Sequence, residues 1–280
     1  AVVTPTYSEA VETARGYYNS DDADNFYFHV WGGEDIHIGI YASDEEEIPR
    51  ASERTVATMA SRLALTPGSR VVDAGAGYGG AARWLARNAG CSVACVNLSE
   101  AQNERNRKIT RAAGLDGLID VHDASFDRIP AEDGQFDFAW SQDSLLHAGD
   151  RAETLAELDR VLKPGGEFIF TDPMQADACP ADVLQPVLDR IHLKTLGSVR
   201  FYRAEAERLG WVDLGFTDLT AHLVRHYSRV RQELESRRPG LRALVSGAYI
   251  ERMLRGLDQW VAAGREGHLA WGILRFRKPV

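Results

Sequence analysis

The segment VVDAGAGYGG at residues 71–80 constrains the fold of this chain more than any other part of the sequence. The apolar run Arg70–Ala74 predicts a buried strand that ends in glycines, and residues 81–88 follow with helical spacing. Glycines at such a turn let the backbone approach a ligand, because no Cβ stands in the way. Free N–H groups at the next helix start attract an anion or a carboxylate. A tight turn that binds no ligand is the alternative interpretation.

Strand and helix signals continue to alternate after this turn. The expected strands are Ser92–Asn97, Leu118–His122, Phe136–Ser141 and Glu167–Thr171, and the expected helices are Glu100–Ala113 and Arg151–Leu162. The Ser99 hydroxyl is a candidate cap for the helix that follows it. Strands that alternate with helices imply a parallel sheet covered on both faces, and right-handed crossovers make it doubly wound.

The pattern changes outside this central region. Residues 1–50 are rich in aromatic and acidic side chains and show no strand alternation. Helices are expected at Ala181–Leu196, His222–Glu235 and Leu241–Ala263, with a break at Gly247, and strands at Val212–Leu219 and His268–Phe276. We therefore divide the chain into a lid at 1–50, a core at 51–175, 201–220 and 266–280, and cap insertions at 176–200 and 221–265.

Composition excludes several classes of partner. The 280 residues carry 32 Lys and Arg against 41 Asp and Glu, a formal charge of -9, which disfavours nucleic-acid binding. No apolar run reaches the roughly 18 residues of a membrane span, and Ala1–Tyr7 does not look like a secretory signal. Cys91, Cys95 and Cys179 fit a reducing, cytoplasmic compartment, and we expect no metal site. The first residue is not Met, and the oligomeric state stays open.

The glycines also match the dinucleotide pattern G-x-G-x-x-G, which expects an acid at the end of the second strand. Asn97 stands there instead, and it can still hydrogen-bond a ribose hydroxyl. Asp123 follows the third strand, where it is placed to accept from an adenine amino group beside the backbone of Ala124 and Ser125. A plain turn residue is the alternative for Asp123.

Five ordered motifs carry a resemblance. They are DAGAGYGG at 73–80, NLSEAQ at 97–102, DAS at 123–125, FDFAWSQDSLLH at 136–147 and LKPGG at 162–166. Together they resemble the class I S-adenosylmethionine-dependent methyltransferases. The resemblance implies a Rossmann-like α/β fold with a seven-stranded, mostly parallel sheet, an antiparallel last strand, a mainly helical cap, and S-adenosyl-L-methionine as cofactor.

A closer resemblance covers nearly the whole chain. It rests on YYNSDDADNFYFHVWGGEDIHIGIY at 17–41, WSQD at 140–143, TDPM at 171–174, LDRI at 188–191, HYSRV at 226–230 and AWG at 270–272. These segments are similar to the sarcosine/dimethylglycine N-methyltransferases that make glycine betaine. The resemblance implies methylation of a small amino-acid amine, dimethylglycine and sarcosine. The alternatives are a small-molecule O- or C-methyltransferase, a phosphoethanolamine-type N-methyltransferase, a dehydrogenase, and a binding protein without activity.

Amine-directed relatives in this resemblance place an Asp and a His near the transferred methyl, which here are Asp143 and His147, and a lid tyrosine, which is Tyr18. A histidine pKa near neutrality suits His147 as a proton relay. Arg190 is expected to hold the substrate carboxylate, with Arg50 and Arg200 as rivals. Further substrate contacts are expected at Tyr18, Tyr27, Asp143, Met174, His226 and Tyr227.

Cofactor contacts follow from the same motifs. They are expected at Trp31, His37, Ile38, Gly75, Ala76, Gly77, Asn97, Leu98, Gln102, Asp123, Ala124, Ser125 and Gln142. Several candidate side chains also have an ordinary structural interpretation. Tyr18, Tyr27 and Trp31 are then core aromatics, Asp143 is a helix cap, His147 is a helix-capping or core histidine, and Arg190 is solvated surface.

Overall fold

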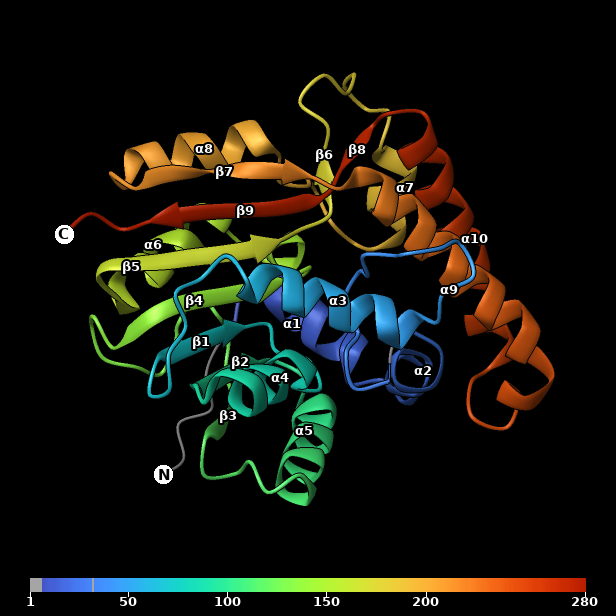
Figure 1. The fold of residues 1–280 in the computed structure, drawn as a ribbon. Helices are drawn as coiled ribbons and strands as arrows, with labels where there is room; N and C mark the ends of the chain where they lie inside the picture. The colour runs from blue at the N-terminus through green and yellow to red at the C-terminus, as the bar shows by residue number, and fades with distance from the viewer. Residues whose placement is uncertain (1–6, 32) are drawn as a thin grey trace.

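The computed structural model describes residues 7–31 and 33–280. Residues 1–6, which belong to the segment expected to lack a signal, and Gly32 of the aromatic string lie outside that range. Seven strands form one sheet in the order β3-β2-β1-β4-β5-β9-β7 (Figure 1). The strands are β1 Arg70–Ala74, β2 Ser92–Asn97, β3 Ile119–Asp123, β4 Phe136–Gln142, β5 Leu162–Thr171, β7 Val212–Asp218 and β9 Gly272–Arg277.

Strand direction confirms the predicted fold class. The pairs β1–β2, β1–β4, β2–β3 and β4–β5 are parallel, whereas β9 runs antiparallel between β5 and β7. The last strand is therefore the antiparallel one, as the resemblance implies. Because β1 and β4 are neighbouring parallel strands, the turns that follow them open side by side at the carboxyl edge. This is the edge at which ligands bind in open α/β sheets.

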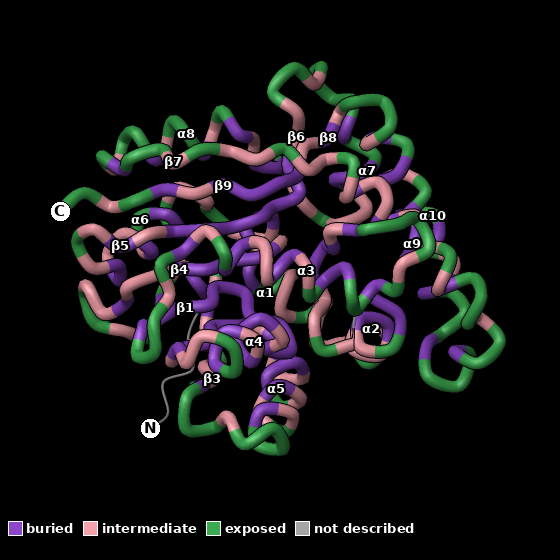
Figure 2. Tube along the Cα trace, in the orientation of Figure 1, coloured by how far each residue is buried: buried purple, intermediate pink, exposed green. Residues whose placement is uncertain are grey.

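Alternating side chains of the strands build two hydrophobic layers. Val71 and Ile169 pack with the helices on one face, and Val72 and Phe168 pack with those on the other. The flanking helices are α3 Ile48–Ala60, α4 Gly80–Ala89 and α5 Glu100–Ala112 with the first group, and α6 Arg151–Val161 and α8 Val199–Arg208 with the second. The central strands are mostly buried towards their carboxyl ends, as parallel strands covered on both faces should be (Figure 2).

A third hydrophobic cluster forms the cap beyond the carboxyl edge. In Figure 1 the arrows of β4 and β5 point towards this region, where α9 and α10 lie side by side. Its elements are α1 Glu9–Tyr18, α2 Asp21–Phe26, the π-helical turn η1 Tyr27–Trp31, α7 Gln185–Arg190, α9 Thr220–Leu241 and α10 Gly247–Arg265, with a small antiparallel pair of β6 Met174–Gln175 and β8 Leu269–Ala270. The cap thus joins segments from both ends of the chain.

Several expected boundaries are wrong. The helix expected at Ala181–Leu196 shrinks to α7, because Asp182 and His192 adopt left-handed backbone conformations on either side of it. The helix expected from Leu241 begins at Gly247, since α9 continues to Leu241. Strand β5 begins at Leu162, five residues before the expected start, and the terminal strand is interrupted at Trp271. Helix α8 was not expected at all.

Three further observations bear on class. None of the helices in the described residues combines the length and the apolar character that a membrane crossing requires. Cys91 and Cys95 are buried free thiols, and Cys179 is partly exposed. Across residues 7–31 and 33–280, no cluster of three or more His, Cys, Asp or Glu side chains is arranged to hold a metal ion.

Candidate active site

A cavity of about 460 Å³ lies between the carboxyl edge of the sheet and the cap. The sheet contributes the glycine turn after β1, residues beyond β2 and the turn after β4, and the cap contributes mainly aromatic side chains. The predicted residues that line it are Tyr18, Tyr27, Trp31, His37, Ile38, Gly75, Gly77, Asn97, Leu98, Gln102, Asp143, His147, Arg190 and Tyr227. An apolar cavity with a few convergent polar groups at this edge is the expected place for a small-molecule site.

The glycine turn is held open by its neighbours. Gly75 and Gly77 have φ values of 82° and 56°, which side chains rarely adopt. A Cβ on Gly75 would stand 2.3 Å from the Ser144 hydroxyl oxygen, so the turn after β4 packs directly on this backbone. Asn97 Oδ1 accepts from the Gly77 N–H at 3.2 Å, and its Nδ2 donates to Gln102 Oε1 at 3.0 Å. Asn97 therefore ties the glycine turn to the start of α5 through the two ends of its amide.

Asp143 joins three parts of the molecule. It follows β4 directly with a φ of 53°, a conformation that few residues other than glycine adopt. Its Oδ2 accepts from the Ile38 N–H of the lid at 2.7 Å, and its Oδ1 accepts from Trp271 Nε1 at 2.8 Å. Burial raises the pKa of Asp143 to about 6, and the two hydrogen bonds oppose that rise. Its carboxylate is therefore mostly ionised at neutral pH and places a negative charge at the cavity wall.

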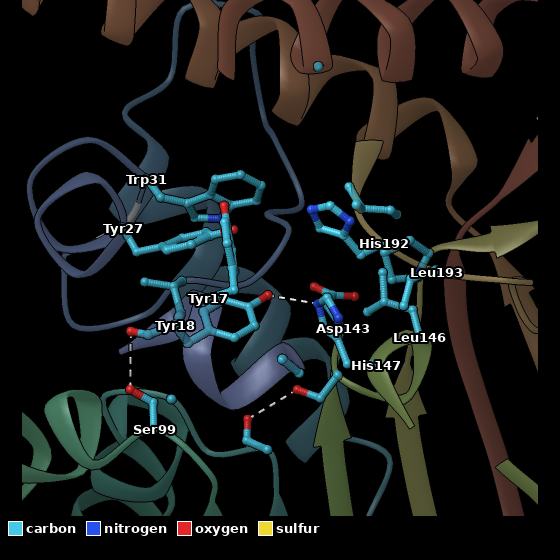
Figure 3. Close-up of a pocket in the computed structure, with 18 of the residues that line it drawn as sticks. Tyr17, Tyr18, Tyr27, Trp31, Ser99, Asp143, Leu146, His147, His192 and Leu193 are labelled. Atoms are coloured by element: carbon cyan, nitrogen blue, oxygen red, sulfur yellow. Dashed lines mark hydrogen bonds between the residues drawn. The ribbon is translucent and has the colours of Figure 1, made fainter. Parts of the chain in front are cut away.

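His147 meets the lid through Tyr18. The Tyr18 hydroxyl and His147 Nε2 lie 2.7 Å apart in hydrogen-bond contact, and the rings meet edge to face at 5.3 Å (Figure 3). The expectation of a near-neutral histidine is wrong, because burial and the nearby Arg151 charge lower the pKa of His147 to about 4. Burial also raises the pKa of Tyr18. At neutral pH this pair is thus a neutral imidazole and a protonated phenol.

Aromatic rings form the opposite wall. Tyr27 and Trp31 both reach the cavity because the π-helical turn η1 sets them on one side, 5.3 Å apart between ring centres. Tyr17 packs edge to face on Tyr18 at 5.0 Å, and its hydroxyl lies 3.0 Å from that of Tyr249 on α10. Figure 3 shows these rings on the lid side, across the cavity from Asp143. Ring faces of this kind attract ammonium and sulfonium cations.

Arg190 lies at the end of α7 on the cavity rim. Its Nη1 donates to the backbone carbonyl of Arg252 at 3.1 Å, and a Cβ on Gly256 would crowd its Cδ at 3.2 Å. Arg252 lines the same cavity and is more exposed than Arg190. The rivals lie elsewhere: Arg50 is exposed on α3, and Arg200 lines a separate shallow hollow on α8.

Seven predicted contacts do not line the cavity: Ala76, Asp123, Ala124, Ser125, Gln142, Met174 and His226. Asp123 accepts from Asn103 Nδ2 at 2.7 Å, and Gln142 accepts from Trp140 Nε1 at 3.0 Å. Met174 is packed in β6, and His226 Nδ1 accepts from the Gly39 N–H at 3.1 Å within the cap. Their predicted binding roles therefore gain no support from this arrangement and stay predictions.

The structure also brings in residues that sequence reasoning missed. They include Tyr17, Ile36, Ser99, Phe126, Ser144, Leu146, His192, Leu193, Tyr249, Arg252, Met253, Leu257 and Trp260. Those on α10 recur every three or four residues, so one helical face was visible in the sequence. The sequence did not show that this face would cover the glycine turn, because the contact is long-range.

Comparisons with known proteins support one family. A family described as methyltransferase domain matches residues 72–170. The sarcosine/dimethylglycine N-methyltransferase of Halorhodospira halochloris is 58% identical over 96% of this chain and 97% of its own length. The enzyme of the same name from Aphanothece halophytica is 51% identical over 98% and 100%. A crystal structure from Galdieria sulphuraria, described as a candidate sarcosine dimethylglycine methyltransferase, is 45% identical, with a TM-score of 0.89 over 94% of this chain and 99% of that one. This chain belongs to the family of sarcosine/dimethylglycine N-methyltransferases.

Proposed function

We propose that this chain transfers a methyl group from S-adenosyl-L-methionine to the amine nitrogen of dimethylglycine, and of sarcosine, so that dimethylglycine becomes glycine betaine. The observation that carries the proposal is the 2.7 Å contact between Tyr18 and His147 beside Asp143, in a cavity that begins at the glycine turn. The relatives named for sarcosine and dimethylglycine support the choice of substrate.

S-adenosyl-L-methionine supplies an electrophilic methyl group on a positively charged sulfur. The residues present fit such a group. Gly75 and Gly77 line the cavity and have no side chain to cover their backbone. Gln102 and Trp31 line the cavity, and their Nε2 and Nε1 atoms are buried donors with no hydrogen-bond partner among the described residues. Buried unpaired donors are costly, so they favour a ligand that brings acceptors. The ionised Asp143 complements the positive charge.

The substrate amine must lose its proton before it attacks. Free aliphatic amines have pKa values near ~10, so most of the substrate arrives as an ammonium ion. Between the two candidate bases, Asp143 with a pKa of about 6 binds a proton more strongly than His147 with a pKa of about 4. We assign Asp143 as the group that receives this proton, since each of its oxygens keeps a lone pair. Tyr18 and His147 then orient the amine as neutral hydrogen-bonding groups.

The substrate carboxylate needs cationic partners at the far end of the cavity. Arg190 and Arg252 both line it there, and a guanidinium offers two parallel donors to a carboxylate. Tyr18, Tyr27, Trp31 and Tyr227 surround the remaining space with ring faces suited to methylated nitrogen. We therefore propose a small amino-acid amine as the substrate class and a lid, core and cap that share one site. The unpaired cysteines favour a cytoplasmic location.

Methyl transfer from labelled S-adenosyl-L-methionine to glycine, sarcosine, dimethylglycine and phosphoethanolamine, measured in parallel, tests the proposal. We expect dimethylglycine to give the quaternary betaine in one transfer, and sarcosine to lose a proton and give dimethylglycine first, then the betaine after a second transfer. Transfer to phosphoethanolamine alone, or to none of the four, would contradict it. Replacement of His147 separates an O-methyltransferase, which needs a general base and should lose all activity, from an amine enzyme, which should lose less.

A further inference from the structure

The backbone next to His147 is held from both sides by charged side chains. The turn η2, Leu145–His147, is three residues long, so its first N–H groups have no partner within the turn. Asp172 Oδ1 accepts from the Leu146 N–H at 3.0 Å, and Arg151 Nη2 donates to the Leu146 carbonyl at 3.1 Å. The Leu146 carbonyl belongs to the peptide group that joins Leu146 to His147. Asp172 and Arg151 thus hydrogen-bond to the two peptide groups on either side of Leu146.

Asp172 is itself anchored in the body of the molecule. It directly follows β5 and has no exposed surface, and its Oδ2 accepts from the Tyr202 hydroxyl at 2.7 Å. Tyr202 on α8 is equally buried in the hydrophobic layer beneath the sheet. Asp172 does not line the cavity, although its neighbour Pro173 does. Burying a carboxylate costs free energy unless hydrogen bonds compensate it. Since Asp172 does not contact the ligand space, its role must lie in the groups to which it hydrogen-bonds.

Arg151 connects the same turn to the cap. Its Nη1 donates to Thr195 Oγ1 at 2.9 Å, and its Nη2 donates to the Thr195 carbonyl at 2.7 Å. Thr195 lies in the segment after α7, two residues beyond Leu193, which lines the cavity together with His192. Figure 3 shows His192, Leu193, Leu146 and His147 along the same wall. The turn that carries His147 is thereby tied to the cap segment beside the substrate space.

We propose that Asp172 and Arg151 are positioning residues that hold the peptide groups of Leu146 and so aim the His147 ring at the Tyr18 hydroxyl. Asp172 ties the turn to β5 and α8, and Arg151 ties it to the cap. The inference rests on the proposed function for the part His147 plays in methyl transfer. It extends that function, because neither side chain touches the cavity. Loosening the Tyr18–His147 contact should lower kcat by no more than its complete loss does, about 3- to 10-fold.

The charges around Asp172 predict how its hydrogen bond to the turn that carries His147 responds to pH. The groups that face it are Arg151 from α6, Tyr202 from α8 and Asp143 after β4. Burial raises its pKa to about 7, while Arg151 and the hydrogen bonds oppose that rise. Both oxygens accept hydrogen bonds fully only in the ionised form, so positioning improves as pH rises through 7. Stability changes in the opposite direction, because a raised carboxyl pKa makes the folded state bind its proton more tightly than the unfolded chain does.

The test measures the histidine directly in the full chain labelled with 15N-histidine, without ligand. Asp172→Ala removes the acceptor of the Leu146 N–H, and we expect the His147 Nε2 resonance to move as the Tyr18 contact loosens. Asp172→Asn keeps one side-chain oxygen for that N–H and should restore most of the wild-type shift. Trp211→Phe is the matched control, since it deletes a 2.7 Å hydrogen bond to Asp159 on the same side of the sheet but away from this turn. It should leave the His147 resonance in place.

Kinetics complete the experiment. Asp172→Ala should lower kcat about 3- to 10-fold, as expected for loss of the Tyr18–His147 contact, and change the KM for S-adenosyl-L-methionine by less than about twofold. Tyr202→Phe, which removes one donor, should raise the Asp172 pKa and move the acid limb of the kcat profile to higher pH, whereas Trp211→Phe should not. A folded Asp172→Ala with an unchanged His147 resonance would overturn the positioning role. A shifted resonance with unchanged methyl transfer would uphold it and instead remove His147 from the proposed function.

Discussion

Two regions meet at the cavity, and they place their side chains by different means. At the sheet edge, Gly75, Gly77 and Asp143 stand where strands end, and their left-handed backbone conformations set the geometry. In the cap, Tyr18 and Arg190 reach the cavity through the packing of helices on one another. The sheet edge is thus shaped by backbone, and the cap is shaped by side-chain contacts.

The polar contacts that join the two regions at the cavity link residues that are far apart in the sequence. The Tyr18 hydroxyl and His147 Nε2 belong to residues 129 positions apart, and Ile38 donates to an Asp143 that lies 105 positions away. Changes at the sheet edge should therefore damage cofactor binding and stability together. Changes in the cap should damage substrate use while most of the fold persists.

The largest effect should come from Gly75→Ala. The alanine backbone would have to keep the unfavourable φ of 82°, and its Cβ would collide with Ser144. Together these effects should destabilise the fold by about 2–4 kcal/mol and abolish measurable methyl transfer. Thermal unfolding and the KM for S-adenosyl-L-methionine measure the two consequences. Gly117→Ala is the control, because nothing lies within 4 Å of its added Cβ. Full activity of Gly75→Ala would show that the sheet edge is not set by its backbone.

Asp143→Asn should have the next largest effect. The amide keeps the shape but turns one acceptor into a donor, which leaves either the Ile38 N–H or Trp271 Nε1 facing another donor. An unsatisfied buried group of this kind costs about 1–3 kcal/mol, and the proposed proton acceptor is also lost. We expect kcat to fall by about 100-fold or more. A variant with wild-type kcat would remove Asp143 from the chemistry and from the junction between lid and core.

Arg190→Ala should separate substrate from cofactor. Loss of a charged hydrogen-bond donor to the carboxylate should raise the KM for dimethylglycine about 10- to 100-fold and leave the KM for the cofactor nearly unchanged. Arg252→Ala should act in the same direction but less, because this residue is more exposed. Arg200→Ala serves as the control, since Arg200 lines a different hollow. Equal changes in both KM values would remove Arg190 from the carboxylate role.

Tyr18→Phe should have a smaller effect. The variant keeps the ring in the cap and removes only the hydroxyl that contacts His147. The loss of one neutral hydrogen bond predicts a fall in kcat of about 3- to 10-fold with little change in unfolding temperature. Tyr17→Phe, whose hydroxyl contacts Tyr249 within the cap, should lower kcat less. The reverse order would point to Tyr17 as the closer partner of the substrate.

Acid should loosen the cap before the core. Burial lowers the pKa of His37 and His226 to about 4 and about 3, so their stabilisation of the lid and cap is lost as pH falls below the unfolded value of about 6.5. Burial raises the pKa of Asp73 in β1 and of Asp172, directly after β5, to about 7, so these parts of the core gain stability over the same pH interval. Burial also raises the pKa of Asp35 in the lid to about 8, which opposes the effect of His37 there. Hydrogen exchange near about pH 7.5 and about pH 5 should show protection falling at 222–230 but not in β1 or β5. An equal loss of protection in the cap and in the core strands would contradict this prediction.

Local patterns predicted most of the sheet and the location of its site. The run before Gly75 and the alternation that follows placed β1, β2 and β4 within a residue of their observed ends. They also placed Asp143 and His147 after β4, because side chains at the carboxyl ends of parallel strands must share one edge. Helix α3 was missed although Ile48, Ser52 and Thr55 face the interior at helical spacing, since aromatic and acidic residues before it masked the period.

The sequence by itself determined the alternating α/β core, the glycine turn and the order of the motifs, because each depends on neighbours within a few residues. Only the tertiary structure decided that Asn97 braces the turn, that α10 adds Arg252 to the cavity, and that His147 is neutral. The physical reason is that burial and long-range packing set both a side chain's partners and its pKa. Residues far apart in the chain come together only when the cap is folded onto the sheet.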